Sequence, residues 1–133
     1  MNKIVFDAED AVVGRLGSHA AKELLKGKEV IIINSEKAII TGDKKNIIER
    51  ILRLRKKGGS SQKGPKISKL PDKLLKRMIR GMLPWDKPRG KEVYKNLKCH
   101  SGNSIKIDAE IKKIQIGKKP SKYLTIKQIS ELI

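Results

Sequence analysis

The feature that most restricts the fold is a run of four β-branched residues, Val30 to Ile33, with no polar side chain among them. Strands that are buried on both faces have this pattern, and they belong to parallel sheets covered by helices. A short apolar run at residues 3–6 precedes it, and residues 13–26 between the two runs carry apolar side chains at helical spacing up to Gly27. Strand, helix and strand in this order predict a parallel pair.

The remaining elements extend this pattern. We expect a strand at residues 38–40, a helix at 44–57 capped by Asp43, a helix at 72–82 started by Pro71, a turn at 84–90, a short helix at 91–96 and a strand at 97–100. Thr125 and Gln128 have capping-box spacing, which predicts a short closing helix. Four strands interleaved with helices indicate an α/β fold with helices on both sides of a mostly parallel sheet. A length of 133 residues suits one compact domain, residues 1–133.

Positive charge is concentrated in the middle of the chain. Residues 44–100 carry 19 Lys and Arg against 4 Asp and Glu, so they supply +15 of the net charge of +18, whereas residues 1–43 have 6 basic and 7 acidic side chains. Such a concentration adds self-repulsion unless a polyanion neutralises it, and phosphate binding gains from the release of counterions. Because aromatic residues make up only 3% of the chain, we expect readout of phosphates and shape rather than base stacking.

The two basic helices are the expected binding surface. Glu49 is the only acid in residues 44–57 and Asp72 the only one in 72–82, whereas solvated helix faces usually mix Glu and Lys. We expect arginine to contribute more than lysine, because a guanidinium can bind a phosphate through two hydrogen bonds. Residues 58–66 are expected to be mobile until an anion orders them. The candidate RNA-binding residues are Arg50, Arg53, Arg55, Lys56, Lys57, Lys63, Lys66, Lys69, Lys73, Arg77, Arg80, Trp85, Lys87, Arg89 and Lys91.

Catalytic and metal sites are disfavoured. Gly14 and Gly17 stand where a phosphate-binding loop could form, but the full glycine fingerprints of such loops are missing. We therefore favour a role of the two glycines in a tight strand-to-helix turn over the binding of an RNA phosphate at this helix end. Cys99 and His100 are adjacent, which suggests a thiol with a histidine as its base. Neighbouring residues in a strand point to opposite faces, so the imidazole cannot take the thiol proton, and we expect a buried, inert cysteine. One cysteine and two histidines are too few to provide the ligands of a zinc site. We therefore predict no catalytic residue, no metal and no cofactor.

The N-terminal sequence MNKIVFDAED has acidic residues where a signal peptide would have an apolar run. No stretch approaches the roughly 20 apolar residues of a membrane span. We expect an intracellular protein with no membrane partner.

Residues 77–102, RMIRGMLPWDKPRGKEVYKNLKCHSG, closely resemble the signature stretch of the universal large-subunit ribosomal protein family designated L-thirteen. Residues 7–27 and 29–44 also fit that family, so the resemblance covers almost the whole chain. Trp85 and Asp86 directly after Pro84, together with the short length, are similar to the archaeal branch.

The resemblance implies a three-layer α/β/α fold around a four-stranded, mostly parallel sheet with basic helical and loop extensions. It also implies a non-enzymatic, cytoplasmic constituent of the large ribosomal subunit that binds large-subunit ribosomal RNA and assists assembly. Neighbouring large-subunit ribosomal proteins are then further partners, and no small-molecule substrate is expected.

Two alternatives remain. One is an RNA- or nucleotide-acting enzyme on the same α/β frame, with residues 14–18 as its phosphate loop. The other is a sequence-specific DNA-binding protein, for which the basic helices carry few of the Asn and Gln side chains that read base edges.

Overall fold

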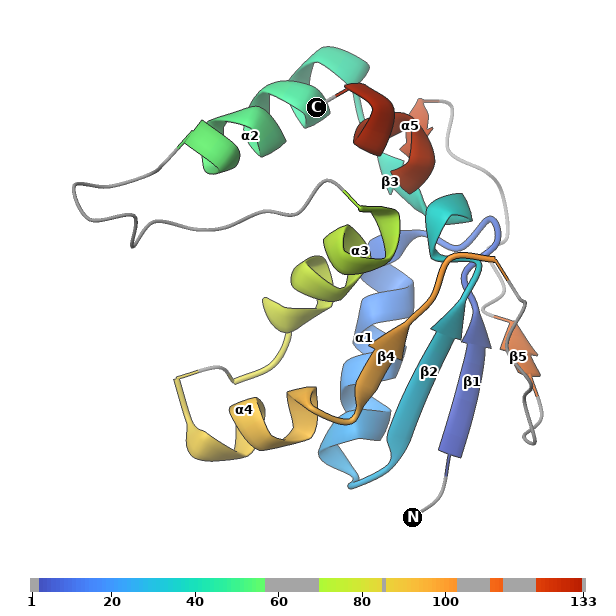
Figure 1. The fold of residues 1–133 in the computed structure, drawn as a ribbon, viewed down its shortest axis with the longest axis vertical. Helices are drawn as coiled ribbons and strands as arrows, with labels where there is room; N and C mark the ends of the chain where they lie inside the picture. The colour runs from blue at the N-terminus through green and yellow to red at the C-terminus, as the bar shows by residue number, and fades with distance from the viewer. Residues whose placement is uncertain (1–2, 57–69, 85, 103–110, 114–121, 133) are drawn as a thin grey trace.

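The computed structural model describes residues 3–56, 70–84, 86–102, 111–113 and 122–132. In chain order the elements are β1 (Lys3–Asp7), α1 (Val13–Leu25), β2 (Glu29–Ile33), the short 3-10 helix η1 (Ser35–Lys37), β3 (Ile39–Thr41), α2 (Lys44–Lys56), α3 (Pro71–Arg80), α4 (Pro88–Tyr94), β4 (Leu97–Cys99), β5 (Ile111–Lys113), β6 (Tyr123–Thr125) and α5 (Ile126–Leu132) (Figure 1).

The main sheet has the strand order β4-β2-β1-β5, and each neighbouring pair is parallel. Val30 of β2 stands opposite both Ile4 of β1 and Leu97 of β4, so the apolar run identified in the sequence is the interior strand. The predicted α/β class and the parallel pairing of the first two strands are confirmed.

The membership of the sheet differs from the sequence interpretation. The sequence pattern predicts that residues 38–40 belong to the main sheet, but β3 pairs antiparallel with β6 in a separate two-stranded sheet. The chain turns away directly after β2, where Asn34 adopts a left-handed conformation (φ 56°) and η1 follows. Neither β5 nor β6 was predicted, because both are three residues long and neither forms an apolar run.

Two helix boundaries also differ from the predicted ones. Helix α3 ends at Arg80, two residues before the expected end, and α4 begins at Pro88 rather than at Lys91. Proline suits the first position of a helix because its missing N–H would have no partner there. The predicted capping box is confirmed: the Thr125 N–H donates to Gln128 Oε1 (3.0 Å) and the Gln128 N–H to Thr125 Oγ1 (3.2 Å).

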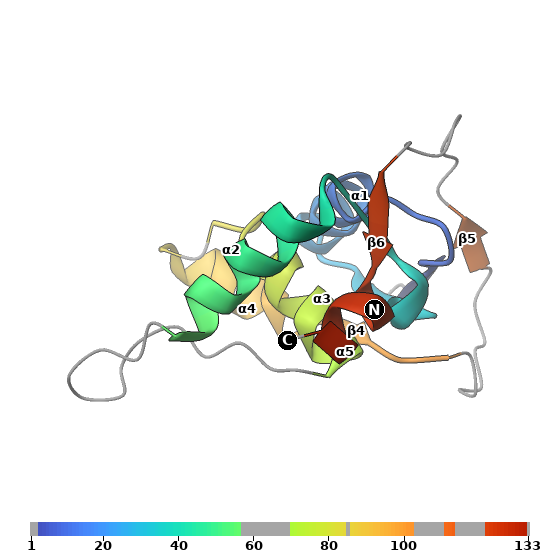
Figure 2. The same ribbon diagram turned by 90° about the horizontal axis from the view of Figure 1, so that it is seen from above.

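The core lies between the main sheet and the helices α1 and α3. Ile4, Val30 and Leu97 form one row across the sheet and are buried against apolar side chains of α1 and α3, such as Leu16 and Ile79. Seen from above, α1 lies on one side of the strands (Figure 2). A helical layer on the opposite face, which the resemblance implies, stays a prediction. In the part of the chain that the structure describes, no helix has the length and apolar character needed to cross a membrane.

Gly17 has a packing role rather than the turn role expected from the sequence. Both Gly14 and Gly17 lie inside α1, and Gly17 is buried against the end of α3. A Cβ atom at Gly17 would overlap the thioether of Met82 and come within 3.5 Å of Ile79, whereas one at Gly14 would have no neighbour within 4 Å. Gly17 therefore allows the close approach of α1 to the segment that follows α3.

This contact predicts different effects for the same substitution at the two glycines. Gly17→Leu should lower the free energy of unfolding by about 1–3 kcal/mol, because the added side chain must displace Met82 and Ile79. Gly14→Leu is the matched control, and it should be neutral or stabilising by up to about 1 kcal/mol, since leucine favours the helix more than glycine does. Urea unfolding measures both. Equal stability of the two variants would contradict the assigned packing role.

Candidate nucleic-acid interface

Helix α2 presents its basic side chains to solvent. Ile47 and Ile51 are buried on its inner side, while Arg50 and Arg53 are exposed. Arg55 and Lys56 also belong to α2, but their side chains lie outside the described part of the structure. The apolar stripe thus fixes the helix against the core and leaves the arginines for a ligand.

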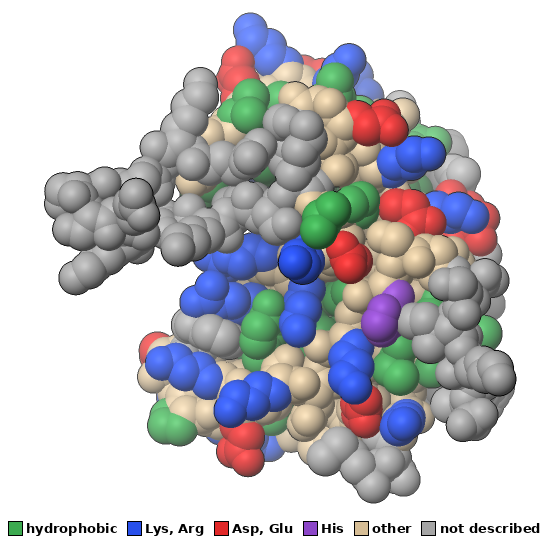
Figure 3. Space-filling view, viewed as in Figure 1, with side chains coloured by type: hydrophobic (Ala, Val, Ile, Leu, Met, Phe, Trp, Pro, Cys, Tyr) green, Lys and Arg blue, Asp and Glu red, His purple; other side chains and the backbone are tan. Residues whose placement is uncertain are grey.

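Helix α3, like α2, has a buried apolar face and a basic face. Leu74, Leu75 and Ile79 are buried, and the opposite face is basic. That face carries the exposed Lys73 and the partly buried Lys76, Arg77 and Arg80. Lys and Arg side chains gather over α3 and α4 on the face shown in Figure 3.

Backbone hydrogen bonds link Lys87 to residues on either side of it at the start of α4. The Lys87 N–H donates to the Pro84 carbonyl (3.0 Å), and the Lys87 carbonyl accepts from Gly90 (3.1 Å). Lys87, Arg89 and Lys91 are all exposed. The Arg89 guanidinium donates to the Leu25 carbonyl at the end of α1. That bond holds α4 on α1 and places a positive charge at the negative end of a helix dipole.

Five of the predicted site residues lie outside the described residues, namely Lys57, Lys63, Lys66, Lys69 and Trp85. The same holds for the segment at 58–66 that was expected to be mobile.

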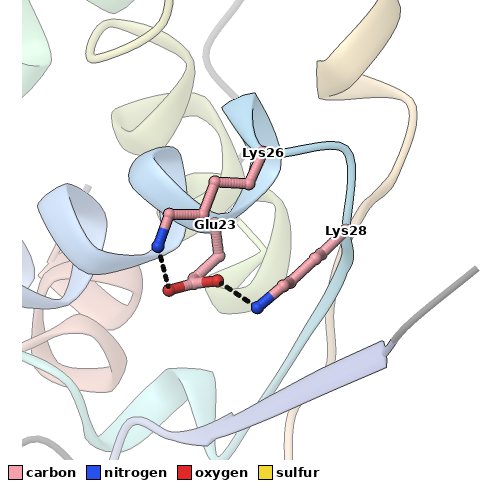
Figure 4. A network of polar contacts seen from close by, with 3 residues as sticks. All are labelled: Glu23, Lys26 and Lys28. Carbon is pink, nitrogen blue, oxygen red and sulfur yellow. Dashed lines mark ion pairs between the residues drawn. The ribbon is translucent and has the colours of Figure 1, made fainter.

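Part of the basic face lacks local charge compensation. Among the described residues, no carboxylate forms an ion pair with Arg50, Arg53, Lys73 or Arg77. By contrast, Glu23 in α1 forms ion pairs with Lys28 (3.0 Å) and Lys26 (3.6 Å), as Figure 4 shows. The lysines at the turn between α1 and β2 are therefore partly neutralised, whereas Arg50, Arg53, Lys73 and Arg77 have no such partner among the described residues.

A tyrosine that was not selected from the sequence lies beside this face. The Lys76 ammonium stands 4.9 Å from the centre of the Tyr94 ring. Burial raises the pKa of the Tyr94 hydroxyl, and Cys99 adds to this, while Arg80 and Arg77 oppose it. The helical spacing of Lys73, Lys76 and Arg80 could have added Lys76 to the predicted set. Its contact with Tyr94 could not be predicted, because the two residues lie on different helices.

The structure argues against the enzyme alternative. Residues 14–18 form helix rather than a phosphate loop, and the Ser18 hydroxyl donates to the Gly14 carbonyl (2.9 Å). Burial raises the pKa of the Cys99 thiol to about 12 against the opposing effect of Lys76, so the thiol is protonated at neutral pH and is not a nucleophile.

The cavity next to the start of α1 does not suit a nucleotide either. It has a volume of about 350 Å³, and its walls are mainly apolar residues of α1, β3 and α2; among the described residues that line it, Arg50 is the one charged side chain. No group of three or more His, Cys, Asp or Glu residues that could hold a metal occurs in the described residues.

Comparison with known proteins agrees with the resemblance seen in the sequence. The family model described as ribosomal protein L13 matches residues 1–106. The large ribosomal subunit protein uL13 of Methanococcus maripaludis is 42% identical, and the match covers 98% of this chain and 96% of that protein. The proteins of the same name from Methanocaldococcus jannaschii and Archaeoglobus fulgidus are 39% and 37% identical over 96% and 97% of this chain, and over 94% and 86% of their own lengths. The chain belongs to the ribosomal protein L13 family.

Proposed function

We propose that this protein is a structural constituent of the large ribosomal subunit, which binds large-subunit ribosomal RNA through α2, α3 and α4 and assists subunit assembly. Family membership supports the ribosomal role, and its relatives carry the name large ribosomal subunit protein. The protein acts in the cytoplasm, where ribosomes work, and it is not an enzyme. Neighbouring large-subunit proteins are its further partners.

The observation that carries the RNA-binding proposal is a set of exposed cations that have no ion-pair partner among the described residues. Arg50, Arg53 and Lys73 are exposed, and no described carboxylate pairs with them. Like charges held on neighbouring helices repel each other, and a phosphate backbone removes this repulsion and releases its condensed counterions. Lysine and arginine contacts to phosphate position a protein on nucleic acid without reading its sequence, so specificity for ribosomal RNA rests on matching its shape.

The first prediction concerns salt. With roughly 6–10 phosphate contacts, affinity for ribosomal RNA should fall about 10³- to 10⁵-fold between 50 and 200 mM monovalent salt. Filter binding with a transcript of archaeal large-subunit ribosomal RNA measures this dependence. An affinity that stays nearly constant over this range would show that phosphate contacts do not dominate.

The second prediction locates the contacts. The double reversal Arg53→Glu with Lys73→Glu should weaken RNA binding at least about tenfold, since a hydrogen bond to a charged group is worth about 1.5 kcal/mol or more. Its salt slope should fall by about 2, because two phosphate contacts are lost. Both side chains are exposed, so the melting temperature should change little.

The matched control is Lys3→Glu with Lys37→Glu, which changes the net charge equally at exposed positions outside the basic face. Lys28 is less suitable, because it pairs with Glu23. Equal loss of affinity in the two double variants would indicate that only net charge matters, and would contradict a localised interface.

A further inference from the structure

The junction of α3, α4 and β4 brings an aromatic ring and several cations together. Tyr94 is the last residue of α4, and its ring is partly buried against the core. Lys76 comes from α3, with its ammonium 4.9 Å from the ring centre. Arg80 lies one helical turn further along the same side of α3.

The contact between Lys76 and Tyr94 restricts an otherwise flexible side chain. A lysine on a helix surface normally samples many rotamers, but an ammonium over an aromatic face is attracted by the ring quadrupole. Because Tyr94 is itself held by packing against the core, the ammonium has a defined position relative to Arg80. Two cations one turn apart therefore present a prepared site.

The same contact decides which part of an RNA this site can take. One face of the Tyr94 ring already carries the Lys76 ammonium, so a base cannot stack on that face without displacing it. Arg80 and Arg77 both act on the Tyr94 hydroxyl electrostatically, which places their charges in the same neighbourhood. Asp72 lies one turn before Lys76, but among the described residues it forms no ion pair with Lys76, and its carboxylate accepts from the Lys73 N–H (2.9 Å). The surroundings favour an anion over a base.

We propose that Lys76 and Arg80 together bind a phosphate group of the RNA backbone, with Tyr94 as the positioning residue that holds Lys76. This inference rests on the proposed RNA-binding function and assigns one defined contact within it. It adds Lys76 and Tyr94 to the candidate RNA-binding residues.

The test measures binding to a transcript of archaeal large-subunit ribosomal RNA, with an unrelated RNA of equal length as reference, at several salt concentrations. Lys76→Gln should lower the affinity and reduce the salt slope by about 0.9, because one phosphate contact is lost. Lys127→Gln on α5 removes the same charge from an exposed position outside the basic face and should leave the slope unchanged.

Variants of Tyr94 separate positioning from packing. Tyr94→Phe keeps the ring and should bind like the parent. Tyr94→Leu removes the ring and should weaken binding roughly two- to fivefold with an unchanged salt slope, because the charge remains but its position is lost. In the Lys76→Gln background, Tyr94→Leu should have no further effect, since there is no ammonium left to position. Circular dichroism at the binding temperature shows whether each variant is folded.

Parent affinity and slope in Lys76→Gln would overturn the phosphate site. An equal effect of Tyr94→Leu with and without Lys76 would overturn the positioning role, because a packing defect weakens binding in both backgrounds. If the parent protein does not distinguish ribosomal from unrelated RNA, the proposed function fails. A reduced slope of Lys76→Gln on either RNA would still support the phosphate site, so the two failures are distinguishable.

Discussion

The pairing of β2 with both β1 and β4 is the constraint on which the rest of the molecule depends. Val30 and Ile32 of β2 are fully buried, and their rows continue into both neighbouring strands. Helix α1 packs against this face, and α3 packs against α1 and β4. The sheet therefore fixes the position of α3, and α2 is anchored through its buried Ile47 and Ile51, although both helices carry mutually repelling charges.

This arrangement separates the nearly neutral part of the chain from the basic part. The unit built from β1, α1 and β2 carries nearly balanced charge, and at its turn Glu23 pairs with Lys26 and Lys28. Charge is added on helices α2, α3 and α4, whose inner faces are apolar. Internal contacts then position individual cations: Arg89 bonds to the end of α1, and Lys76 rests on Tyr94. Holding these cations in place in the free protein lowers the entropic cost of ordering them on a ligand.

Those features that depend on local pattern could be predicted from the sequence. The buried run at Val30–Ile33, the apolar stripes of the helices and the Thr125–Gln128 capping box all follow from spacing within one segment. The basic faces of α2 and α3 followed from the same periodicity. Residues 38–40 were misplaced because a left-handed Asn34 redirects the chain, and one sequence gives little sign of such a turn.

Contacts between distant elements could not be predicted in this way. The local pattern predicts a turn residue at Gly17, because the helix that packs on it, α3, lies more than fifty residues later. The position of Lys76 over Tyr94 and the bond from Arg89 to Leu25 likewise join separate elements. The membership of β5 in the main sheet depends on pairing with β1, because a strand of three residues has too little pattern of its own.

The central claim is that the cations of α2, α3 and α4 face ribosomal RNA, and crosslinking of lysine side chains to RNA in purified large subunits tests it most directly. Mass spectrometry of the crosslinked peptides should find RNA adducts on Lys73, Lys87 and Lys91, which are exposed on or next to these helices. Lys3, Lys37 and Lys127 are exposed elsewhere on the molecule and should carry few. Adducts concentrated on the second group, with the first group unmodified, would contradict the account.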